Sequence, residues 1–134
     1  METNAKTILY VDDDPDDLAM FRMAVETLGS AYRIVEAFDG MQALTLLVQM
    51  QQCDELPSLI VLDINMPRMD GKQTLVAIQS KPELACIPIV LFSTSSSHMD
   101  KVFSESRKVE LITKPFSFET LRAITYKLLH YLNE

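Results

Sequence analysis

Groups that can bind metal and phosphate stand at the ends of four hydrophobic runs in this sequence. The runs at 8–11, 59–62 and 89–92 are followed by Asp12-Asp13-Asp14, by Asp63 and by Ser93, and the run at 111–112 leads through Thr113 to Lys114. Short apolar runs separated by helical patterns are typical of buried parallel strands in an alternating β/α protein. Ligands of such sheets bind outside the carboxyl ends of the strands. We therefore expect a site for Mg²⁺ and a phosphoryl group at one edge of one sheet.

The residue types at these positions suit that chemistry. Mg²⁺ takes oxygen ligands and is held by one or two carboxylates, with waters and phosphate oxygens completing its shell. Asp13 and Asp63 suit direct ligation, and Asp12 suits a metal-bound water. A carboxylate at a strand end can also act as a nucleophile and form an acyl phosphate. The metal, the Lys114 ammonium and the Ser93 hydroxyl would then neutralise the oxygens of the transferred group.

The bulk composition predicts one compact domain that binds neither nucleic acid nor membranes. The chain has 134 residues, 48% of them hydrophobic and 23% charged, which is an ordinary globular balance. Its formal net charge of −7 argues against nucleic acid, because phosphate-backbone binding needs clustered Lys and Arg. No signal peptide or membrane-length apolar stretch is present. Cys53 and Cys86 lack paired or metal-ligand spacing, which indicates reduced thiols in a cytoplasmic protein.

Five strands and five helices are expected in strict alternation, with right-handed crossovers placing helices on both faces of the sheet. Charged residues inside the run 32–37 indicate an edge strand. The first helix should begin at Pro15, whose fixed φ suits a first helical position. Residues that can cap or open helices precede the first, second, third and fifth of them: Asp14, Asp39, Asp70 and Ser117.

The expected fourth helix, over residues 97–106, has few apolar residues to hold it. Met99, Val102 and Phe103 are the anchors that its sequence offers. Few buried contacts mean a small local stability, so this helix is expected to be mobile. Because it lies beside Ser93, we expect it to respond to the site. The expected output face consists of Met99, Val102 and Phe103 with Leu111.

Four short strings occur together in one order and spacing. They are Val11-Asp12-Asp13-Asp14-Pro15, Asp63-Ile64-Asn65-Met66-Pro67-Arg68-Met69-Asp70-Gly71, Ser93-Thr94 and Lys114-Pro115-Phe116. These strings resemble the receiver domain of two-component response regulators, and the resemblance covers about residues 7–132. It implies an α/β fold: a doubly wound, five-stranded parallel sheet of order 2-1-3-4-5, a flavodoxin-like (βα)5 domain. No residues remain for an output domain, so we expect a single-domain regulator of the chemotaxis or phytochrome-linked kind.

The resemblance also implies roles for individual residues. Asp63 would accept a phosphoryl group from a sensor histidine kinase or a phosphotransfer protein. The metal ligands would be Asp12, Asp13, Asp63 and the backbone carbonyl of Asn65, with Mg²⁺ as the metal and Mn²⁺ as an alternative. Ser93 would move toward the phosphoryl group, Lys114 would pair with it, and Lys114–Pro115 would be a cis peptide. Apart from its own phosphotransfer and autodephosphorylation, such a protein has no enzymatic substrate, and its output is contact with a downstream protein.

One position departs from the family pattern. Many receiver domains have an aromatic residue three positions before the lysine, and this residue turns inward when the hydroxyl residue moves. Leu111 stands there in this sequence. An aromatic rotamer switch is therefore not expected, although Leu111 can still repack between two states.

Two other functions are compatible with parts of the sequence. In a small phosphatase of the haloacid-dehalogenase kind, Asp12 would be the nucleophile and Asp63 only a ligand. The chain lacks the length that such enzymes use for a substrate cap. In a phosphorylation-independent binding module the fold would serve only its surface, but the intact acids, Ser93 and Lys114 argue against that reading. The sequence leaves the oligomeric state open, a homodimer included.

Overall fold

The structure, a computed structural model, describes residues 6–29, 31–66, 69–94 and 97–132. Its strands are β1 (Lys6–Val11), β2 (Tyr32–Ala37), β3 (Leu59–Asp63), β4 (Ile89–Ser93) and β5 (Glu110–Thr113). Its helices are α1 (Pro15–Glu26), α2 (Gly40–Gln52), α3 (Gly71–Gln79), α4 (His98–Arg107) and α5 (Phe118–Leu132). The strands form one parallel sheet of order β2-β1-β3-β4-β5, which confirms the predicted fold.

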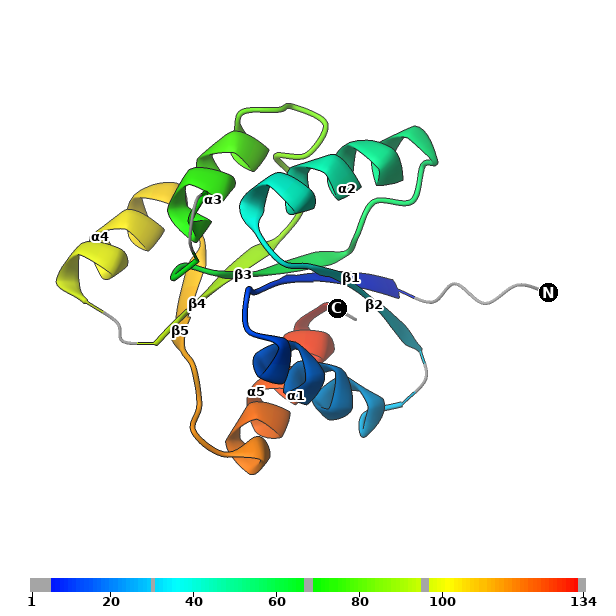
Figure 1. The fold of residues 1–134 in the computed structure, drawn as a ribbon, viewed down its shortest axis with the longest axis vertical. Coiled ribbons are helices and arrows are strands. Elements are labelled where there is room, and N and C mark those ends of the chain that lie inside the picture. Colours follow the sequence, from blue (N-terminus) through cyan, green and yellow to red (C-terminus); the bar gives the residue numbers. More distant parts are fainter. Residues whose placement is uncertain (1–5, 30, 67–68, 95–96, 133–134) are drawn as a thin grey trace.

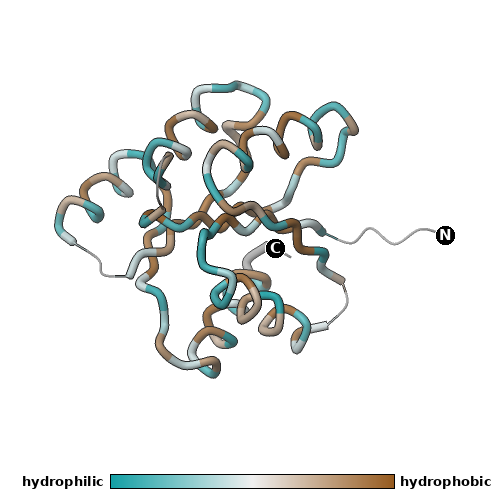
Figure 2. Tube along the Cα trace, viewed as in Figure 1, coloured by the Kyte–Doolittle hydropathy of each residue, from teal (hydrophilic) through white to brown (hydrophobic). Residues whose placement is uncertain are grey.

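The sheet separates two hydrophobic cores. Helices α2, α3 and α4 lie on one face, and α1 and α5 lie on the other (Figure 1). Alternate strand residues point to opposite faces, so Leu9 and Val11 of β1 join the core under α2 and α3, whereas Ile8 and Tyr10 join the core under α1 and α5. Hydrophobic residues accordingly follow the strands and the inner helix faces in Figure 2. Among the described residues, no helix combines the length and apolarity of a membrane span.

The strand register brings the carboxyl ends of the inner strands to one edge. Val11 is paired with Leu62, so Asp12 and Asp63 each lie one position further along neighbouring strands. Ser93 is paired with Thr113 at the ends of β4 and β5, and Lys114 follows directly. Strands β3 and β4 are buried along their whole length, whereas β2 is partly exposed, in keeping with its predicted edge position.

Side-chain caps fix where the helices begin. The Asp14 carboxylate accepts a hydrogen bond from Asp16 N at 2.9 Å, and Pro15 is the first residue of α1, as predicted. Asp70 and Gln73 form a reciprocal capping box at the start of α3. These caps fix the first residues of α1 and α3, the helices that follow the acidic ends of β1 and β3.

The structure corrects the predicted anchoring of α4. The side chains of Met99 and Val102 are exposed, with 75% and 51% of their surface accessible, and only Phe103 of the three packs against the core. The buried face of α4 carries Asp100 and Ser104 instead. Polar contacts replace the missing apolar ones, because this face lies against a lysine of α3. The prediction that Met99 and Val102 anchor the helix is therefore wrong.

Candidate functional site

Three carboxylates meet at the carboxyl edge of the sheet. Asp12 and Asp13 follow β1, Asp63 ends β3, and one oxygen of each lies within 4.8 Å of the others. Asp12 and Asp63 are buried, whereas Asp13 is exposed. Clustered carboxylate oxygens that are open to solvent on one side are a donor set that suits Mg²⁺ or Mn²⁺. These are the three acids that were predicted to meet at this edge.

Asp12 accepts three hydrogen bonds. Its Oδ1 atom accepts from the backbone N–H of Asp14 at 3.0 Å, and its Oδ2 atom accepts from the Tyr10 hydroxyl at 3.1 Å and from Lys114 Nζ at 2.9 Å. The Tyr10 ring is buried and stacks on Phe21, with centroids 4.4 Å apart. Burial, with the Asp12 carboxylate beside the hydroxyl, raises the pKa of Tyr10 well above its usual range, so the hydroxyl remains a donor.

Lys114 joins three acids at the site. Its Nζ atom lies 2.8 Å from Asp17 Oδ2, 2.9 Å from Asp12 Oδ2 and 3.4 Å from Asp63 Oδ2. Burial alone would lower the pKa of Lys114, but hydrogen bonds to Asp17 and Asp12 outweigh it and raise the pKa above its ordinary value. Its backbone N–H also donates to the carbonyl of Ser93 at 2.7 Å. The lysine is therefore a fixed, charged element of the site.

Asp63 has an unusual protonation equilibrium. Burial, and next the charge of Asp12, raise its pKa to about 7, although Lys114 and the backbone N–H of Asn65 oppose this shift. The Asn65 N–H donates to Asp63 Oδ1 at 3.0 Å. A proton and a metal ion would therefore compete for this carboxylate near neutral pH.

A side-chain bridge joins the loops that follow β3 and β4. The Oδ1 atom of Asn65 accepts from the N–H and the hydroxyl of Thr94, both at 3.2 Å. Ser93, the residue before Thr94, is fully buried at the end of β4. The expected site residues thus lie at one edge. Pro67 and Arg68 of the recognised string lie outside the described residues.

The sequence model of the family "Response regulator receiver domain" matches residues 8–126. The chain belongs to this family. The Rcp1 response regulator of Synechocystis is 32% identical over 101 residues, which cover 74% of this chain and 69% of that protein. The phosphorylated cyanobacterial phytochrome response regulator RcpA has a TM-score of 0.87 at 31% identity, with 96% of this chain and 94% of that one covered. The Mn²⁺-bound form of Rcp1 has a TM-score of 0.78 at 28% identity, with 92% and 91% covered.

Receiver domains act in phosphorylation-based signalling through two-component systems. They take up phosphoryl groups from sensor histidine kinases and bind a divalent metal at an acidic pocket. The acidic edge of this receiver domain brings Asp12, Asp13 and Asp63 together, a group that could hold such a metal ion. Family membership favours this function over the haloacid-dehalogenase alternative.

Two contacts of this receiver domain were missed by the sequence analysis. Tyr10 precedes Asp12 by two residues, so the alternation of side chains along β1 places both on one face, and this spacing was an available signal. Asp17 lies on α1, and its contact with Lys114 depends on how α1 leaves the sheet. No local pattern in the sequence predicts that contact.

The predicted cis peptide is not found. The Lys114–Pro115 bond is trans, and none of the peptide bonds in the described residues is cis. The tertiary amide before a proline prefers trans by about 0.5–1 kcal/mol, so cis needs a specific tertiary cause. Here Lys114 reaches its three carboxylates from a trans backbone.

The expected output face of the receiver domain divides into two parts. Met99 and Val102 are exposed on α4, whereas Phe103 and Leu111 pack partly buried against the core under α2 and α3. Exposed apolar side chains on α4 can contact another protein.

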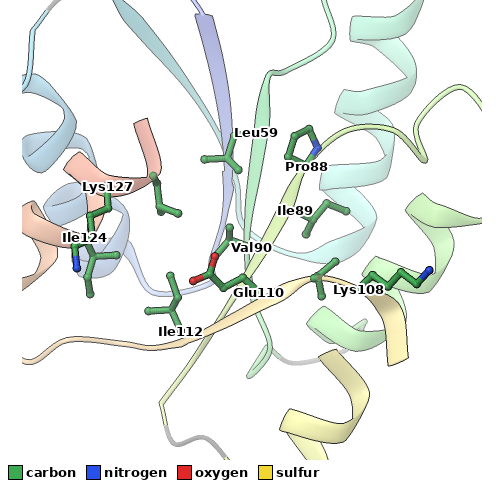
Figure 3. A pocket seen from close by; sticks show the side chains of 11 residues that line it. Leu59, Pro88, Ile89, Val90, Lys108, Glu110, Ile112, Ile124 and Lys127 are labelled. Atoms are coloured by element: carbon green, nitrogen blue, oxygen red, sulfur yellow. The ribbon is translucent and has the colours of Figure 1, made fainter. Parts of the chain in front are cut away.

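One groove on the described surface is remote from the acids. It has a volume of about 730 Å³ and is lined by the first residues of β3, β4 and β5 and by α5 (Figure 3). Leu59, Ile112 and Ile124 are among its apolar lining residues, and Lys108 and Lys127 also line it. Because strand starts line it, this groove lies at the opposite edge of the sheet from Asp63 and does not take part in the chemistry of the site.

Proposed function

We propose that this receiver domain accepts a phosphoryl group on Asp63 from a sensor histidine kinase or a phosphotransfer protein. The observation that carries the proposal is the convergence of Asp12, Asp13 and Asp63 with the Lys114 ammonium at one sheet edge. An acceptor carboxylate, a donor set for a divalent cation and a fixed positive charge are what in-line phosphoryl transfer requires.

In the transfer, an Asp63 oxygen attacks the phosphorus of a phosphohistidine. A P–O bond forms and the P–N bond breaks, so the histidine leaves with the electron pair and takes up a proton. Asp63 must be ionised to attack. Because its pKa is raised to about 7, the fraction of Asp63 that is ionised changes with pH near neutrality. Lys114 supplies positive charge to the oxygens of the incoming phosphoryl group. Ser93, which carries the hydroxyl, follows Phe92, the residue of β4 that is paired with Asp63.

A divalent ion fits beside the acceptor. Asp12, Asp13, Asp63 and the backbone carbonyl of Asn65 would hold it, with Mg²⁺ as the physiological ion and Mn²⁺ as an alternative. Once bound, it would supply positive charge to the phosphoryl oxygens. The residues of the chain do the remaining work: Tyr10 and the Asp14 N–H orient Asp12, and the Asn65 N–H orients Asp63.

The output of the domain is a change in its contact with a downstream protein. Phosphorylation at Asp63 would draw in Ser93 and shift α4, with its exposed Met99 and Val102. Taking such a switch from mostly off to mostly on requires phosphorylation to favour the active state by about 5 kcal/mol. The free Cys53 and Cys86 thiols fit a reducing, cytoplasmic setting.

Labelling by a small phosphodonor tests the proposal. With acetyl phosphate and Mg²⁺, wild type should gain one phosphoryl group by intact mass, Asp63→Asn should gain none, and Asp12→Asn should be labelled slowly. Labelling that survives Asp63→Asn and disappears with Asp12→Asn would instead support the phosphatase reading. No labelling of any variant, with partner binding unchanged, would support a phosphorylation-independent module.

A further inference from the structure

The Lys114 ammonium donates hydrogen bonds to Asp12 and Asp17 and forms a longer ion pair with Asp63. An ammonium group has three N–H donors. Its three acidic neighbours are Asp17 at 2.8 Å, Asp12 at 2.9 Å and Asp63 at 3.4 Å. The contact with Asp63 is the longest, so the charge is held toward α1. A phosphoryl group on Asp63 that draws the ammonium closer must therefore pull it against its two shorter contacts, with Asp17 and Asp12.

The three carboxylates differ in how easily they can be displaced. The side chains of Asp12 and Asp63 are buried, with 0% and 2% of their surface exposed, so neither can exchange Lys114 for water. The Asp17 side chain is 34% exposed on the first turn of α1, where water can replace the ammonium. Asp17 also lies outside the group of acids that suits a metal ion. Its release costs least and leaves the metal donors in place.

We propose that Asp17 is a positioning residue that competes with the phosphoryl group for Lys114. This inference rests on the proposed function of Asp63. In the unphosphorylated state Asp17 holds the ammonium on the α1 side of the site. For the phosphoryl group to bind the Lys114 ammonium closely, the ion pair between Asp17 and Lys114 must break. Asp17 therefore lowers the affinity of the site for the phosphoryl group and favours the unphosphorylated state.

Asp17 also has a role that any acid in this turn would share. A carboxylate in the first turn of a helix is stabilised by the helix dipole. Asp16 is in the same turn and has the same charge, but its side chain is exposed to solvent. Asp16→Asn therefore removes the same net charge and the same dipole interaction without removing a contact to Lys114. It is the matched control for Asp17→Asn.

The test measures binding of beryllofluoride, which mimics a phosphoryl group on a carboxylate, in the presence of saturating Mg²⁺. Calorimetric titration of the full chain should show tighter binding by Asp17→Asn than by Asp16→Asn, by about 3- to 5-fold, the range expected for one partly exposed ion pair. Asp17→Glu, which restores the carboxylate, should return the affinity toward wild type. Asp17→Ser is a second neutral variant, and thermal unfolding establishes that each variant is folded.

The outcomes separate the inference from the proposed function. Equal affinities for Asp17→Asn and Asp16→Asn would overturn the inference, because only net charge would then matter. Weaker binding by Asp17→Asn would overturn it as well, since Asp17 would be aiming Lys114 at the phosphoryl group. If wild type fails to bind beryllofluoride at all, the proposed function of Asp63 fails and the inference falls with it.

Discussion

The Tyr10 hydroxyl donates a hydrogen bond to Asp12 Oδ2 at 3.1 Å from inside the core under α1 and α5. This contact ties an acid of the site to a buried ring that stacks on Phe21 and meets Phe92 edge-on, with centroids 6.2 Å apart. The orientation of Asp12 is therefore set by core packing as well as by the loop that follows β1.

Removing that hydroxyl should weaken metal binding. We expect Tyr10→Phe to lower the Mg²⁺ affinity by about 10-fold, because groups that hydrogen-bond to metal ligands orient them. The change keeps the aromatic ring and should cost about 1 kcal/mol of unfolding free energy for the lost hydrogen bond. Calorimetric Mg²⁺ titration measures the affinity. Tyr126→Phe, at an exposed tyrosine of α5, is the control and should match wild type.

The pKa of Asp63 predicts how its charge affects stability. The folded pKa, about 7, is above the unfolded value of about 4, so the folded state binds this proton more tightly. The resulting stabilisation is complete below the unfolded pKa and is lost as the pH rises through the folded pKa. Asp63→Asn should therefore raise the melting temperature in EDTA more at pH 8 than at pH 5. A constant difference between the two proteins across this range would refute the assignment.

The same equilibrium governs metal affinity. A proton on Asp63 competes with the ion, so Mg²⁺ affinity should fall as the pH drops below about 7. Proton release on Mg²⁺ binding, measured by calorimetry in buffers of different ionisation enthalpy, should be large at pH 6 and small at pH 8. Asp63→Asn should release few protons at either pH.

Gly71 holds α3 against the site by close backbone approach. A Cβ atom there would lie 2.2 Å from the Asp63 carbonyl oxygen and 2.7 Å from Ile64 Cα, neither of which can move alone. We expect Gly71→Ala to cost about 1–3 kcal/mol of stability and to slow acetyl phosphate labelling. Gly29→Ala is the control, because Gly29 has a φ of +124° but open space around it. It should destabilise the protein through backbone strain while the folded fraction is labelled at the wild-type rate.

Polar contacts hold α4 to α3. Lys72 Nζ lies 2.7 Å from Asp100 Oδ1 and 5.4 Å from the centroid of the Phe103 ring, and the hydrogen bond from Lys72 lowers the pKa of Asp100. We expect Lys72→Met to speed hydrogen exchange of the α4 amides several-fold, with at most about 1 kcal/mol lost globally, since the pair is partly exposed. Lys101→Met, at an exposed lysine of α4, should leave exchange unchanged. Equal exchange in the two variants would show that α4 is held by other contacts.

Sequence patterns predicted the sheet and the acids for a simple physical reason. Buried parallel strands need continuous apolar runs, and the residue that ends each run must lie at the carboxyl edge. The positions of Asp12, Asp63 and Ser93 follow from that, and Lys114 lies one residue beyond the end of β5. Helix starts were likewise predictable, because Asp14 and the other caps act on backbone groups two or three residues away.

Contacts between different helices and strands could not be predicted from the sequence patterns. The ion pair of Asp17 with Lys114 spans 97 positions and depends on the angle of α1. In α4 the buried face carries Asp100 in place of the apolar residues Met99 and Val102, because Lys72 of α3 neutralises it. The cis bond expected before Pro115 had only the family resemblance behind it and no local physical cause in the sequence, and the bond is trans.

The most direct test of the account locates the phosphoryl group itself. After incubation with acetyl phosphate and Mg²⁺, borohydride reduction converts an aspartyl phosphate to homoserine, and peptide mass spectrometry identifies the modified position. The account predicts homoserine at position 63 and unmodified aspartate at positions 12 and 13. Homoserine at position 12, or a phosphoryl group that resists reduction because it is on Ser93, would contradict it.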